Sequence, residues 1–304
     1  MDNKSSKKIP LVSIILPTYN RAYCIVRAVN SVIDQSFIDW EMIVIDNNSI
    51  DGTVGLVTSF GDPRISCFTL SNNGIVASSR NFGINMAKGK YIAFIDSDDS
   101  WDVEKLKLSV DLLESGEDIV YHDLYICSDK FLTKFRKKRL KARHLKRPIF
   151  DDLWVNGNAL NNSSVVCRRE LLIKAGGLSE DLNILASEDY LMWLEMSKIT
   201  ENFKKIDQTL GNYWLGADNL SCLKKTLIAN DYLLKYFSEK NLTVPGWMYY
   251  ANARAYLELL ETQKAAYNAW MAMTSRNNIK IKIKSLITWL YAKFLTVISK
   301  INND

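Results

Sequence analysis

Along the first hundred residues, short continuous apolar runs alternate with segments whose apolar residues recur every three or four positions. The continuous runs predict buried strands over residues 11–17, 40–46, 65–70 and 91–95. The periodic segments predict helices over residues 22–35, 53–60 and 75–87. Strands that alternate with helices in this way form an α/β fold with a mostly parallel, doubly wound sheet.

Beyond residue 100 the alternation continues less regularly. The predicted elements are a helix to about residue 115, strands over residues 118–127 and 161–169, and helices over residues 170–175 and from residue 190. From about residue 221 the strand signals end, and helices are predicted over residues 223–237, 247–273 and 279–298. We therefore expect an α/β domain over residues 1–220 and a helical C-terminal region over residues 221–304.

Composition agrees with a globular protein. The chain has 304 residues, of which 47% are hydrophobic and 24% charged, with a net charge of +5. The five cysteines are odd in number and show no C-x-x-C spacing, so unpaired thiols in a reducing compartment are expected. The first ten residues are polar and do not follow the pattern of a secretory signal, and no run of 18 apolar residues predicts a membrane-spanning helix.

Three carboxylates follow the apolar run 91–95 within four positions: Asp96, Asp98 and Asp99. In an open α/β sheet, ligands bind beyond the carboxyl ends of the strands, so these side chains are expected beside a ligand. Carboxylates this close repel one another unless a cation offsets their charge. One interpretation is Mg²⁺ or Mn²⁺ held by one or two carboxylates and by substrate phosphates; the other is an acidic turn that caps the next helix.

The sequence lacks the glycine-rich loops that bind phosphates in many α/β proteins. No G-x-G-x-x-G follows the first strand and no G-x-x-x-x-G-K-[ST] occurs, which disfavours a dinucleotide-binding fold and a P-loop. Phosphates would then need a metal ion or basic side chains, and the Asp cluster and Arg80 offer both. Asp46, which ends the run 40–46, adds a second acidic strand end to the same edge of the sheet.

A second acidic pair, Glu188 and Asp189, stands where the helix from Tyr190 is predicted to begin. One interpretation is a helix cap whose charge interacts favourably with the helix dipole, worth about 0.5–1 kcal/mol. The other is a general base that takes a proton from a reacting hydroxyl group. The pattern alone leaves both interpretations open.

Two segments combine positive charge with a possible role at a membrane. Residues 130–147 contain ten Lys or Arg and no acid, which predicts a solvated excursion, or attraction to an anionic membrane surface or a pyrophosphate-bearing acceptor. No nucleic-acid-binding motif accompanies this patch, so nucleic acid is not expected as a partner. Residues 279–298 mix lysines with aliphatic and aromatic residues, which is typical of a helix in the membrane interface or of a helix packed on the α/β domain.

Five ordered motifs resemble those of the inverting nucleotide-sugar glycosyltransferases of family 2, which have the GT-A fold. The resemblance covers roughly residues 11–198. The motifs are V-S-I-I-L-P-T-Y-N-R over residues 12–21, the strand ending at Asp46 with Ser49 and D-G-T at 51–53, N-G at 73–74 with S-R-N-F-G at 79–83, K-G-K-Y-I-A-F-I-D-S-D-D-S-W over residues 88–101, and S-E-D-Y at 187–190 with Trp193. The resemblance implies a GT-A domain with a nucleotide-sugar half over about 11–101 and an acceptor half over about 102–220.

The resemblance also implies a role for each matching position. Asp189, with Glu188 beside it, would be the general base, and Asp99 with Asp98 would hold the metal ion, Mn²⁺ or Mg²⁺. Where many members have a second acid after the aspartate of the second strand, this chain has Asn47, which can still bond a uracil edge through its amide. The donor-binding positions implied are Pro17, Thr18, Tyr19, Asn20, Arg21, Asp46, Asn47, Arg80, Asp96 and Asp98.

The implied activity is the inverting transfer of a hexose from a UDP-sugar, with UDP-glucose as the first expectation. The implied acceptor is GlcNAc or GalNAc linked to undecaprenyl diphosphate, in the synthesis of O-antigen or related surface polysaccharide. The expected location is cytoplasmic, with peripheral attachment to the inner face of the bacterial inner membrane. The alternatives are another donor such as UDP-Gal or UDP-GlcNAc, a capsule or exopolysaccharide acceptor, and a nucleotide-sugar binder without catalytic activity.

Overall fold

The structure is a computed structural model that describes residues 9–128, 138–215, 223–238, 242–275 and 279–301. The chain divides into two compact units, each discontinuous in sequence. Unit 1 comprises Met1–Leu145, Leu160–Leu178 and Lys198–Ala217, and unit 2 comprises Lys146–Ala159, Ser179–Ser197 and Asp218–Asp304. The domain boundary near residue 220 stays a prediction, and residues 130–137 of the basic segment lie outside the described residues.

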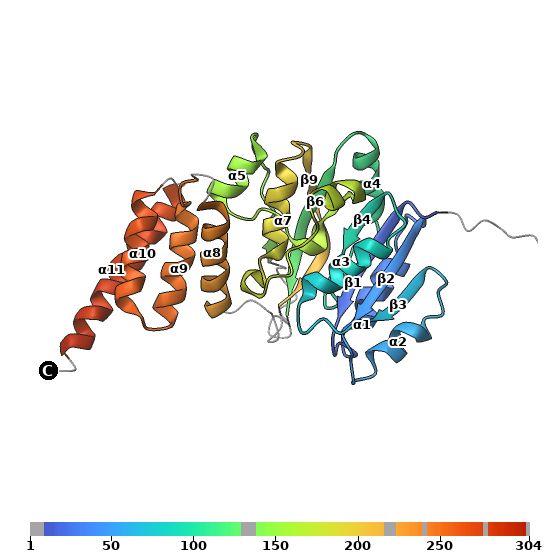
Figure 1. Ribbon diagram of the computed structural model, residues 1–304, viewed down its shortest axis with the longest axis horizontal. Helices are drawn as coiled ribbons and strands as arrows, with labels where there is room; N and C mark the ends of the chain where they lie inside the picture. The colour runs from blue at the N-terminus through green and yellow to red at the C-terminus, as the bar shows by residue number, and fades with distance from the viewer. Residues whose placement is uncertain (1–8, 129–137, 216–222, 239–241, 276–278, 302–304) are drawn as a thin grey trace, which may run out of the picture. The chain divides into compact units, whose positions relative to one another are not determined.

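Unit 1 is built on one mixed sheet, which has nine strands over the described residues (Figure 1). The sheet order is β3-β2-β1-β4-β8-β6-β9-β5, and β7 pairs with β6. The strands are β1 Val12–Thr18, β2 Trp40–Asp46, β3 Ile65–Thr69, β4 Tyr91–Phe94, β5 Ser100–Trp101, β6 Ile119–Cys127, β7 Arg139–Leu140, β8 Val166–Arg168 and β9 Phe203–Trp214. The helices are α1 Ile25–Ile33, α2 Thr53–Ser59, α3 Val76–Met86, α4 Lys105–Glu114, the 3₁₀ turn η1 Asn162–Ser164 and α6 Arg169–Lys174.

The first four strands by sheet position, β3, β2, β1 and β4, run parallel, with Val12 opposite Trp40 and Thr18 opposite Asp46. Because a helix or loop returns the chain to the other end of the sheet between these strands, their carboxyl ends gather at one edge. β8 runs antiparallel to β4 and β6, and β5 runs antiparallel to β9. The predicted α/β class is confirmed, and the antiparallel pairings are confined to the second half of the sheet.

Helices cover both faces of the parallel strands (Figure 1). On one face, Val12, Ile14 and Leu16 of β1 pack with apolar residues of α1 and α4 in the main core. On the other face, α3 lies so close to β1 that a Cβ atom at Gly83 would be 2.8 Å from Cγ2 of Ile15. Because both faces are covered, β1, β2 and β4 are buried at nearly every position, which explains their continuous apolar runs. β3, at the edge of the sheet, is only partly buried.

Several elements differ from the sequence-based expectation. The strand predicted over residues 161–169 begins as η1, and only its later part forms β8. The helix predicted over residues 247–273 is divided into α9 (Gly246–Glu258) and α10 (Thr262–Thr274), with Leu260 between them at a φ of 60°. The pattern does not predict β9, because its residues show no regular alternation of buried and exposed positions.

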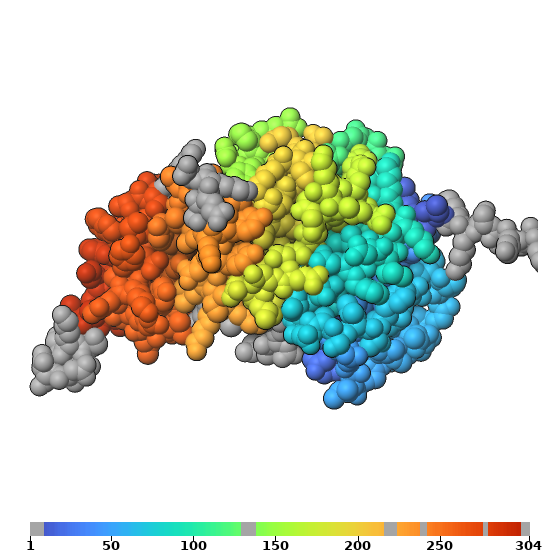
Figure 2. Space-filling view, in the orientation of Figure 1, coloured from blue at the N-terminus to red at the C-terminus, as the bar shows by residue number. Residues whose placement is uncertain are grey.

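Unit 2 is helical over its described residues. Besides α9 and α10 it contains α5 Ile149–Asn156, the 3₁₀ turn η2 Leu182–Ile184, α7 Glu188–Ser197, α8 Leu223–Ser238 and α11 Ile279–Ile301. The Tyr190 hydroxyl of α7 donates to the carbonyl of Leu153 in α5 at 2.8 Å, and the Tyr190 ring lies 5.6 Å from the Trp247 ring of α9. Figure 2 shows α9, α10 and α11, in orange to red, packed against one another. None of the described helices combines the length and the apolar character needed to cross a membrane.

Candidate functional site

The carboxyl ends of β1, β2 and β4 bring most of the predicted donor residues together in unit 1. Thr18 ends β1 opposite Asp46 at the end of β2, and the backbone amide of Asn47 donates to the carbonyl of Thr18 at 2.9 Å. Next to β1, β4 leads directly into the loop that holds Asp96, Asp98 and Asp99. These loops therefore share one edge of the sheet, while the role of each residue in binding a donor stays a prediction.

The loop after β1 is held by the loop after β2. The backbone amide of Asn20 donates to Ser49 Oγ at 2.8 Å, and Asn20 Oδ1 accepts from the amide of Ile50 at 2.9 Å. The amide of Arg21 donates to Thr53 Oγ1 at 2.9 Å. Asn20 has a φ of 49°, a left-handed conformation in which Asn is enriched. These bonds hold the two loops against each other.

The other residues of the first loop differ in exposure. Pro17 and Thr18 are buried in β1, whereas Tyr19 is 54% exposed. The Arg21 side chain lies beside Tyr23 and near Asp98. Burial lowers the pKa of the Arg21 guanidinium, but the neighbouring Tyr23 and Asp98 outweigh burial, so the pKa is raised overall. Arg21 therefore keeps its positive charge next to the acidic loop.

Asp46 and Asn47 lie at the end of β2, and Asn47 connects this end to the loop after β3. Asp46 is fully buried and accepts a hydrogen bond from the backbone amide of Ser49 at 2.9 Å. Asn47 Oδ1 accepts from the amide of Asn72, in the loop after β3, at 2.9 Å, and Asn72 Nδ2 donates to Ser79 Oγ at 2.8 Å. The side-chain oxygen of Asn47 is thus used inside the protein, and Nδ2 is the group that a nucleotide base could meet.

The three acids after β4 have different surroundings. Asp96 forms an ion pair with Arg80 of α3, with 2.7 Å between Nη2 and Oδ1. Asp99 is 1% exposed, and its Oδ1 accepts from the amide of Trp214 in β9 at 2.9 Å. Asp99 Oδ2 is buried and has no hydrogen-bond partner within the described ranges. Asp98 is partly buried, and the guanidinium of Arg27 donates to its backbone carbonyl.

Burial and mutual repulsion disfavour charge on two of these acids. Burial raises the pKa of the Asp98 carboxyl, and the charge of Asp96 raises it further. Burial also raises the pKa of Asp99 well above its ordinary value of 3.8, with repulsion from Asp96 and then Asp98 adding to the effect. The neighbouring Ser163 hydroxyl and the hydrogen bond from the Trp214 amide lower the pKa of Asp99, but they do not outweigh burial. A positively charged ligand would therefore be bound most strongly by Asp98 and Asp99.

Ser163 of η1 supports the acidic loop, and the sequence alone does not single it out. Its Oγ accepts from the backbone amide of Asp96 at 3.1 Å, and its carbonyl accepts from Trp101 Nε1 at 2.8 Å. The sequence feature that could have pointed to Ser163 is the polar run N-N-S-S at 161–164. In the structure, Asn162, Ser163 and Ser164 of this run are all buried. Buried polar groups need partners, so such a run indicates a structured polar site.

Two cation–aromatic contacts flank the acidic loop and were also not expected. The guanidinium carbon of Arg27 lies 4.4 Å from the Trp214 ring centroid. Lys105, at the start of α4, is fully buried with Nζ 3.5 Å from the Trp101 ring centroid. Lys105 Nζ has no hydrogen-bond partner among the residues that the structure describes, and burial lowers its pKa well below 10.5.

The acidic loop fits a divalent cation that a substrate helps to hold. Within the described parts of the chain, no group of three or more His, Cys, Asp or Glu side chains forms a complete metal cage. Mg²⁺ does not need one, because one or two carboxylates together with water and substrate phosphates commonly complete its coordination. The unpartnered Oδ2 of Asp99 and the neighbouring Asp98 carboxylate provide such a pair.

Glu188 and Asp189 begin α7 in unit 2. Glu188 is 6% exposed, and Asp189 is partly buried. Asp189 Oδ1 accepts from the backbone amide of Tyr190 at 2.7 Å, which satisfies a free amide at the helix start. This hydrogen bond is of the kind that the helix-cap interpretation expects. The general-base role stays a prediction, as does the partnership of Asp189 with the donor residues of unit 1.

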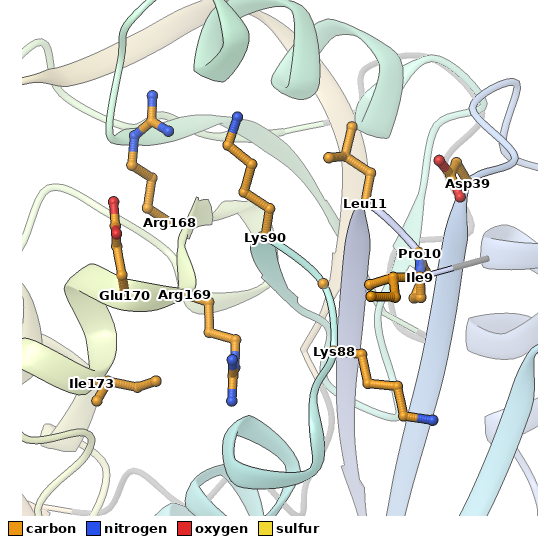
Figure 3. Close-up of a pocket in the computed structure, with 11 residues that line it drawn as sticks. Ile9, Pro10, Leu11, Asp39, Lys88, Lys90, Arg168, Arg169, Glu170 and Ile173 are labelled. Carbon is orange, nitrogen blue, oxygen red and sulfur yellow. The ribbon is translucent and has the colours of Figure 1, made fainter. Parts of the chain in front are cut away.

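A pocket of about 460 Å³ lies at the opposite edge of the sheet in unit 1 (Figure 3). It is lined by residues that precede the parallel strands, including Leu11 before β1, Asp39 before β2 and Lys90 before β4. Lys90 pairs with Glu114 at 2.8 Å and Arg168 with Asp118 at 2.6 Å, so these two cations are already compensated. In an α/β sheet, ligands bind at the carboxyl edge, so this pocket is not the donor site.

Comparison with known proteins identifies a family that matches more than half of the chain. The family described as Glycosyl transferase family 2 matches residues 13–174. The "Putative teichuronic acid biosynthesis glycosyltransferase TuaG" of Bacillus subtilis (strain 168) is 42% identical over 219 residues, which cover 71% of this chain and 83% of TuaG. The Escherichia coli protein WfgD, named "UDP-Glc:alpha-D-GlcNAc-diphosphoundecaprenol beta-1,3-glucosyltransferase", is 29% identical over 189 residues, covering 62% of this chain and 70% of WfgD.

Solved structures share the fold at low sequence identity. S. aureus TarS 1–349 in complex with UDP-GlcNAc has a TM-score of 0.57 at 17% identity, covering 96% of this chain and 91% of that chain. The mannosyltransferase PcManGT from Pyrobaculum calidifontis, in complex with GDP-Man and Mn²⁺, has a TM-score of 0.58 at 16% identity, covering 95% of this chain and 86% of that chain. The family match, the TuaG relative and the shared GT-A fold lead to one conclusion: this chain belongs to glycosyl transferase family 2 and is a glycosyltransferase.

Proposed function

We propose that this glycosyltransferase moves a hexose from a UDP-sugar, with UDP-glucose as the first choice, to GlcNAc or GalNAc linked through diphosphate to undecaprenol. The product would be a β-linked intermediate of bacterial surface polysaccharide, with O-antigen as the first choice. The name of the relative WfgD supports this donor and acceptor, because it specifies UDP-Glc and GlcNAc-diphosphoundecaprenol. The name of TuaG, a putative teichuronic acid enzyme, favours a different surface polymer as the alternative.

The observation that supports a nucleotide-diphosphate donor most directly is the charge state of the acidic loop. The guanidinium of Arg80 offsets the charge of Asp96, whereas Asp99 is buried with no hydrogen-bond partner for its Oδ2 among the described residues. Burial raises the pKa of both Asp98 and Asp99, although Arg21 and Arg27 act against the rise at Asp98. Ionising two buried acids at the carboxyl edge of a parallel sheet costs stability, and a cation bound together with a diphosphate would remove that cost.

In this proposal each part of the site has one task. The loop from Pro17 to Arg21, with Asp46 and Asn47, would border the uridine, and Asp98 would approach the ribose. Asp99 and Asp98 would hold Mn²⁺ or Mg²⁺, which when bound would offset the negative charge that develops on the departing diphosphate. Arg80 would keep Asp96 and the loop backbone in place beside it, through the 2.7 Å ion pair.

The acceptor side of the reaction is assigned to Asp189. Its carboxylate would take the proton of the acceptor hydroxyl while that oxygen attacks the anomeric carbon of the donor. The bond between the anomeric carbon and the diphosphate oxygen breaks, and UDP leaves with the electron pair. Because attack comes from the face opposite to the leaving group, one displacement inverts the anomeric centre. We place this reaction at the inner face of the bacterial inner membrane, since the acceptor carries a lipid.

A two-way screen tests the proposal. Full-length protein with Mn²⁺ is given radiolabelled UDP-glucose, UDP-Gal, UDP-GlcNAc or GDP-mannose, each with synthetic GlcNAc-diphosphate or GalNAc-diphosphate lipids. The expected result is label transfer for one donor and acceptor pair, with a β-linkage in the product by NMR. Transfer from GDP-mannose but from no UDP-sugar would contradict the donor assignment. Tight binding of UDP-sugars without transfer or UDP release would favour the non-catalytic binder.

A further inference from the structure

The outward side of α11, in unit 2, is apolar. Seven of its large apolar side chains are between 45% and 68% exposed: Ile279, Ile283, Leu286, Ile287, Leu290, Phe294 and Val297. They recur every three or four positions along the 23-residue helix, so they lie along one side of it. At about 1.5 Å per residue the helix, and the apolar stripe along it, is about 30 Å long. We call these seven side chains the apolar stripe.

The opposite side of α11 packs on unit 2 through smaller and more polar residues. Ser285 and Ala292 are fully buried, and Thr296 Oγ1 donates to Thr262 Oγ1 of α10 at 2.8 Å. Trp289 contributes a ring at 6.1 Å from the Trp270 ring of α10. A helix on a protein surface normally turns its apolar side inward and its polar side to water. On α11, large apolar side chains lie along the exposed side as well, which indicates that this side meets something other than water.

The charges of α11 are of one sign. The helix contains five lysines and no acidic residue between Ile279 and Ile301. With a turn of about 100° per residue, Lys282 and Lys293 fall along one border of the apolar stripe and Lys284 along the other. An apolar stripe bordered by cations matches the interface of an anionic bilayer, where acyl chains lie beneath negatively charged headgroups.

We propose that the apolar stripe of α11 is a membrane-docking surface and that its partner is an anionic lipid bilayer. The helix lies parallel to the membrane plane, with the stripe inserted about 5–10 Å to the boundary between headgroups and acyl chains. Lys282, Lys284 and Lys293 then reach the headgroups. The purpose of the surface, access to a lipid-linked acceptor, rests on the proposed function, whereas the docking itself does not.

The same charges argue against a second copy of this chain as the partner. In a two-fold interface formed by the apolar stripe, the lysine borders of one helix would face those of the other, with no acid on α11 to compensate them. A membrane-spanning role is also excluded for α11, because no described helix meets the length and hydropathy required. A lipid surface satisfies both the apolar stripe and its cationic borders.

Vesicle sedimentation with the full-length protein tests the proposal. We expect binding to vesicles of phosphatidylglycerol and phosphatidylethanolamine, and weaker binding to vesicles of phosphatidylcholine alone. Leu290 and Phe294 are 55% and 60% exposed, so Leu290→Gln with Phe294→Gln removes apolar surface without opening a cavity. The double variant should bind phosphatidylglycerol vesicles about 100-fold more weakly, as expected for withdrawing two large apolar side chains from the bilayer. Lys282→Gln with Lys293→Gln should weaken binding to the anionic vesicles only.

A matched control uses apolar residues that are exposed elsewhere. Ile38 and Ile173, in unit 1, are 74% and 52% exposed, and Ile38→Gln with Ile173→Gln should leave vesicle binding unchanged. Thermal unfolding by circular dichroism checks that every variant is folded. Unchanged binding in the Leu290/Phe294 variant would overturn the proposal. So would a dimer in gel filtration that this variant dissociates, together with no vesicle binding by the natural sequence.

The same variants separate this proposal from the proposed reaction. Transfer to a water-soluble acceptor analogue should be equal in the natural sequence and the Leu290/Phe294 variant, whereas transfer to the lipid-linked acceptor in vesicles should fall in the variant. If the protein docks on vesicles but transfers no sugar to either acceptor, the proposed function fails and the docking surface stands. If it transfers sugar to both acceptors equally in all variants, docking through α11 fails and the function stands.

Discussion

Arg80 Nη2 lies 2.7 Å from Asp96 Oδ1, and the Arg80 side chain is only 7% exposed. This ion pair makes the three acids of the loop after β4 unequal, because it offsets the charge of Asp96, whereas burial raises the pKa of Asp98 and Asp99. The sequence presents the three carboxylates as one cluster. The structure divides them into one acid that is paired with a guanidinium and two acids whose pKa is raised by burial.

Arg80→Ala should destabilise the protein by leaving the Asp96 carboxylate without its partner. Because Asp96 is 33% exposed and water can partly replace the guanidinium, we expect a coupling energy of about 1–2 kcal/mol between the two side chains. The measurement is a double-mutant cycle of Arg80→Ala and Asp96→Asn, read from urea unfolding. The exposed pair Lys90 and Glu114, 2.8 Å apart, is the control, and its coupling should stay below about 0.5 kcal/mol. Equal coupling in both pairs would contradict a structural role for Asp96.

Asp99→Asn should stabilise the ligand-free protein and abolish transfer. The pKa of Asp99 is raised in the folded state, so the resulting loss of stability is absent below the ordinary pKa near 3.8, grows as the pH rises from there towards the folded pKa, and is constant above it. The stability difference between the variant and the natural sequence should therefore widen from about pH 4 upward and reach about 1–2 kcal/mol. Asn can keep the 2.9 Å bond from the Trp214 amide, because its Oδ1 remains an acceptor.

The readout for Asp99 is the melting temperature across pH, with and without UDP and Mn²⁺. The ligands should raise the melting temperature of the natural sequence strongly and that of the variant weakly, because the variant lacks the anionic oxygen for the cation. Asp111→Asn on the exposed side of α4 is the matched control and should change neither quantity. An equal ligand effect in the Asp99 variant would remove Asp99 from the metal site.

Ser163→Ala should lower the stability of the protein and weaken metal binding by the acidic loop. The change removes the acceptor of the Asp96 amide, at 3.1 Å, and also the hydroxyl that counteracts the raised pKa of Asp99. A buried amide left without a partner costs about 1–3 kcal/mol, so unfolding should be easier by that amount. The Mn²⁺ concentration needed for half-maximal transfer should rise as well, since Asp99 would bind its proton more tightly.

Ser164→Ala is the neighbouring control for Ser163. The Ser164 hydroxyl is equally buried and donates only to the carbonyl of Asn161, at 2.7 Å. We expect a similar loss of stability and no change in the Mn²⁺ dependence. The same shift in Mn²⁺ dependence for both variants would mean that Ser163 contributes only to folding.

Asp189→Asn should lower the turnover number while leaving donor binding intact. A positioned general base contributes typically about 10²–10⁴-fold, and Asn cannot take the proton of the acceptor hydroxyl. Asn keeps an oxygen that can accept the 2.7 Å bond from the Tyr190 amide, so the start of α7 should be preserved. Single-turnover transfer and calorimetric UDP-sugar binding are compared with those of Asp151→Asn, an exposed acid in the first turn of α5. Near-normal turnover would leave Asp189 as a helix cap only.

Lys105→Met should stabilise the protein. Lys105 is fully buried, and no acidic side chain of the described residues forms an ion pair with it. Burial lowers its pKa well below 10.5, so below its folded pKa the protein holds a buried charge with no acidic partner. That cost is full at low pH and disappears as the pH rises to 10.5, where the unfolded chain also loses the proton. The gain of about 1–2 kcal/mol should therefore shrink with rising pH. Lys107→Met, exposed on the same helix, should show no such trend.

The regular part of the fold could be predicted because its elements are determined by local pattern. The parallel strands β1, β2 and β4 read as continuous apolar runs, since helices cover both faces. The carboxyl edge followed from the ends of those runs, so Asp46 and the acidic loop were expected near one another. The contacts of the site were not predictable. They depend on residues distant in sequence, such as Ser163 at the Asp96 amide and Trp214 at the Asp99 carboxylate.

The sequence by itself determined the α/β class, the alternation of strands and helices, and which strands are followed by acidic residues. These features depend on the spacing of apolar residues and on turn residues, both of which act over a few positions. Only the tertiary structure decided which acid is paired with a guanidinium and which acids are buried so that their pKa is raised. β9 has no alternating pattern, yet it lies beside β6 and β5 and delivers the Trp214 amide to Asp99. α11 likewise was a lysine-rich apolar helix in sequence, and packing through Ser285 and Ala292 decided that its larger apolar side faces outward. Burial and pairing are properties of three-dimensional neighbours, and the same Asp or Leu has a different role according to what the fold places against it.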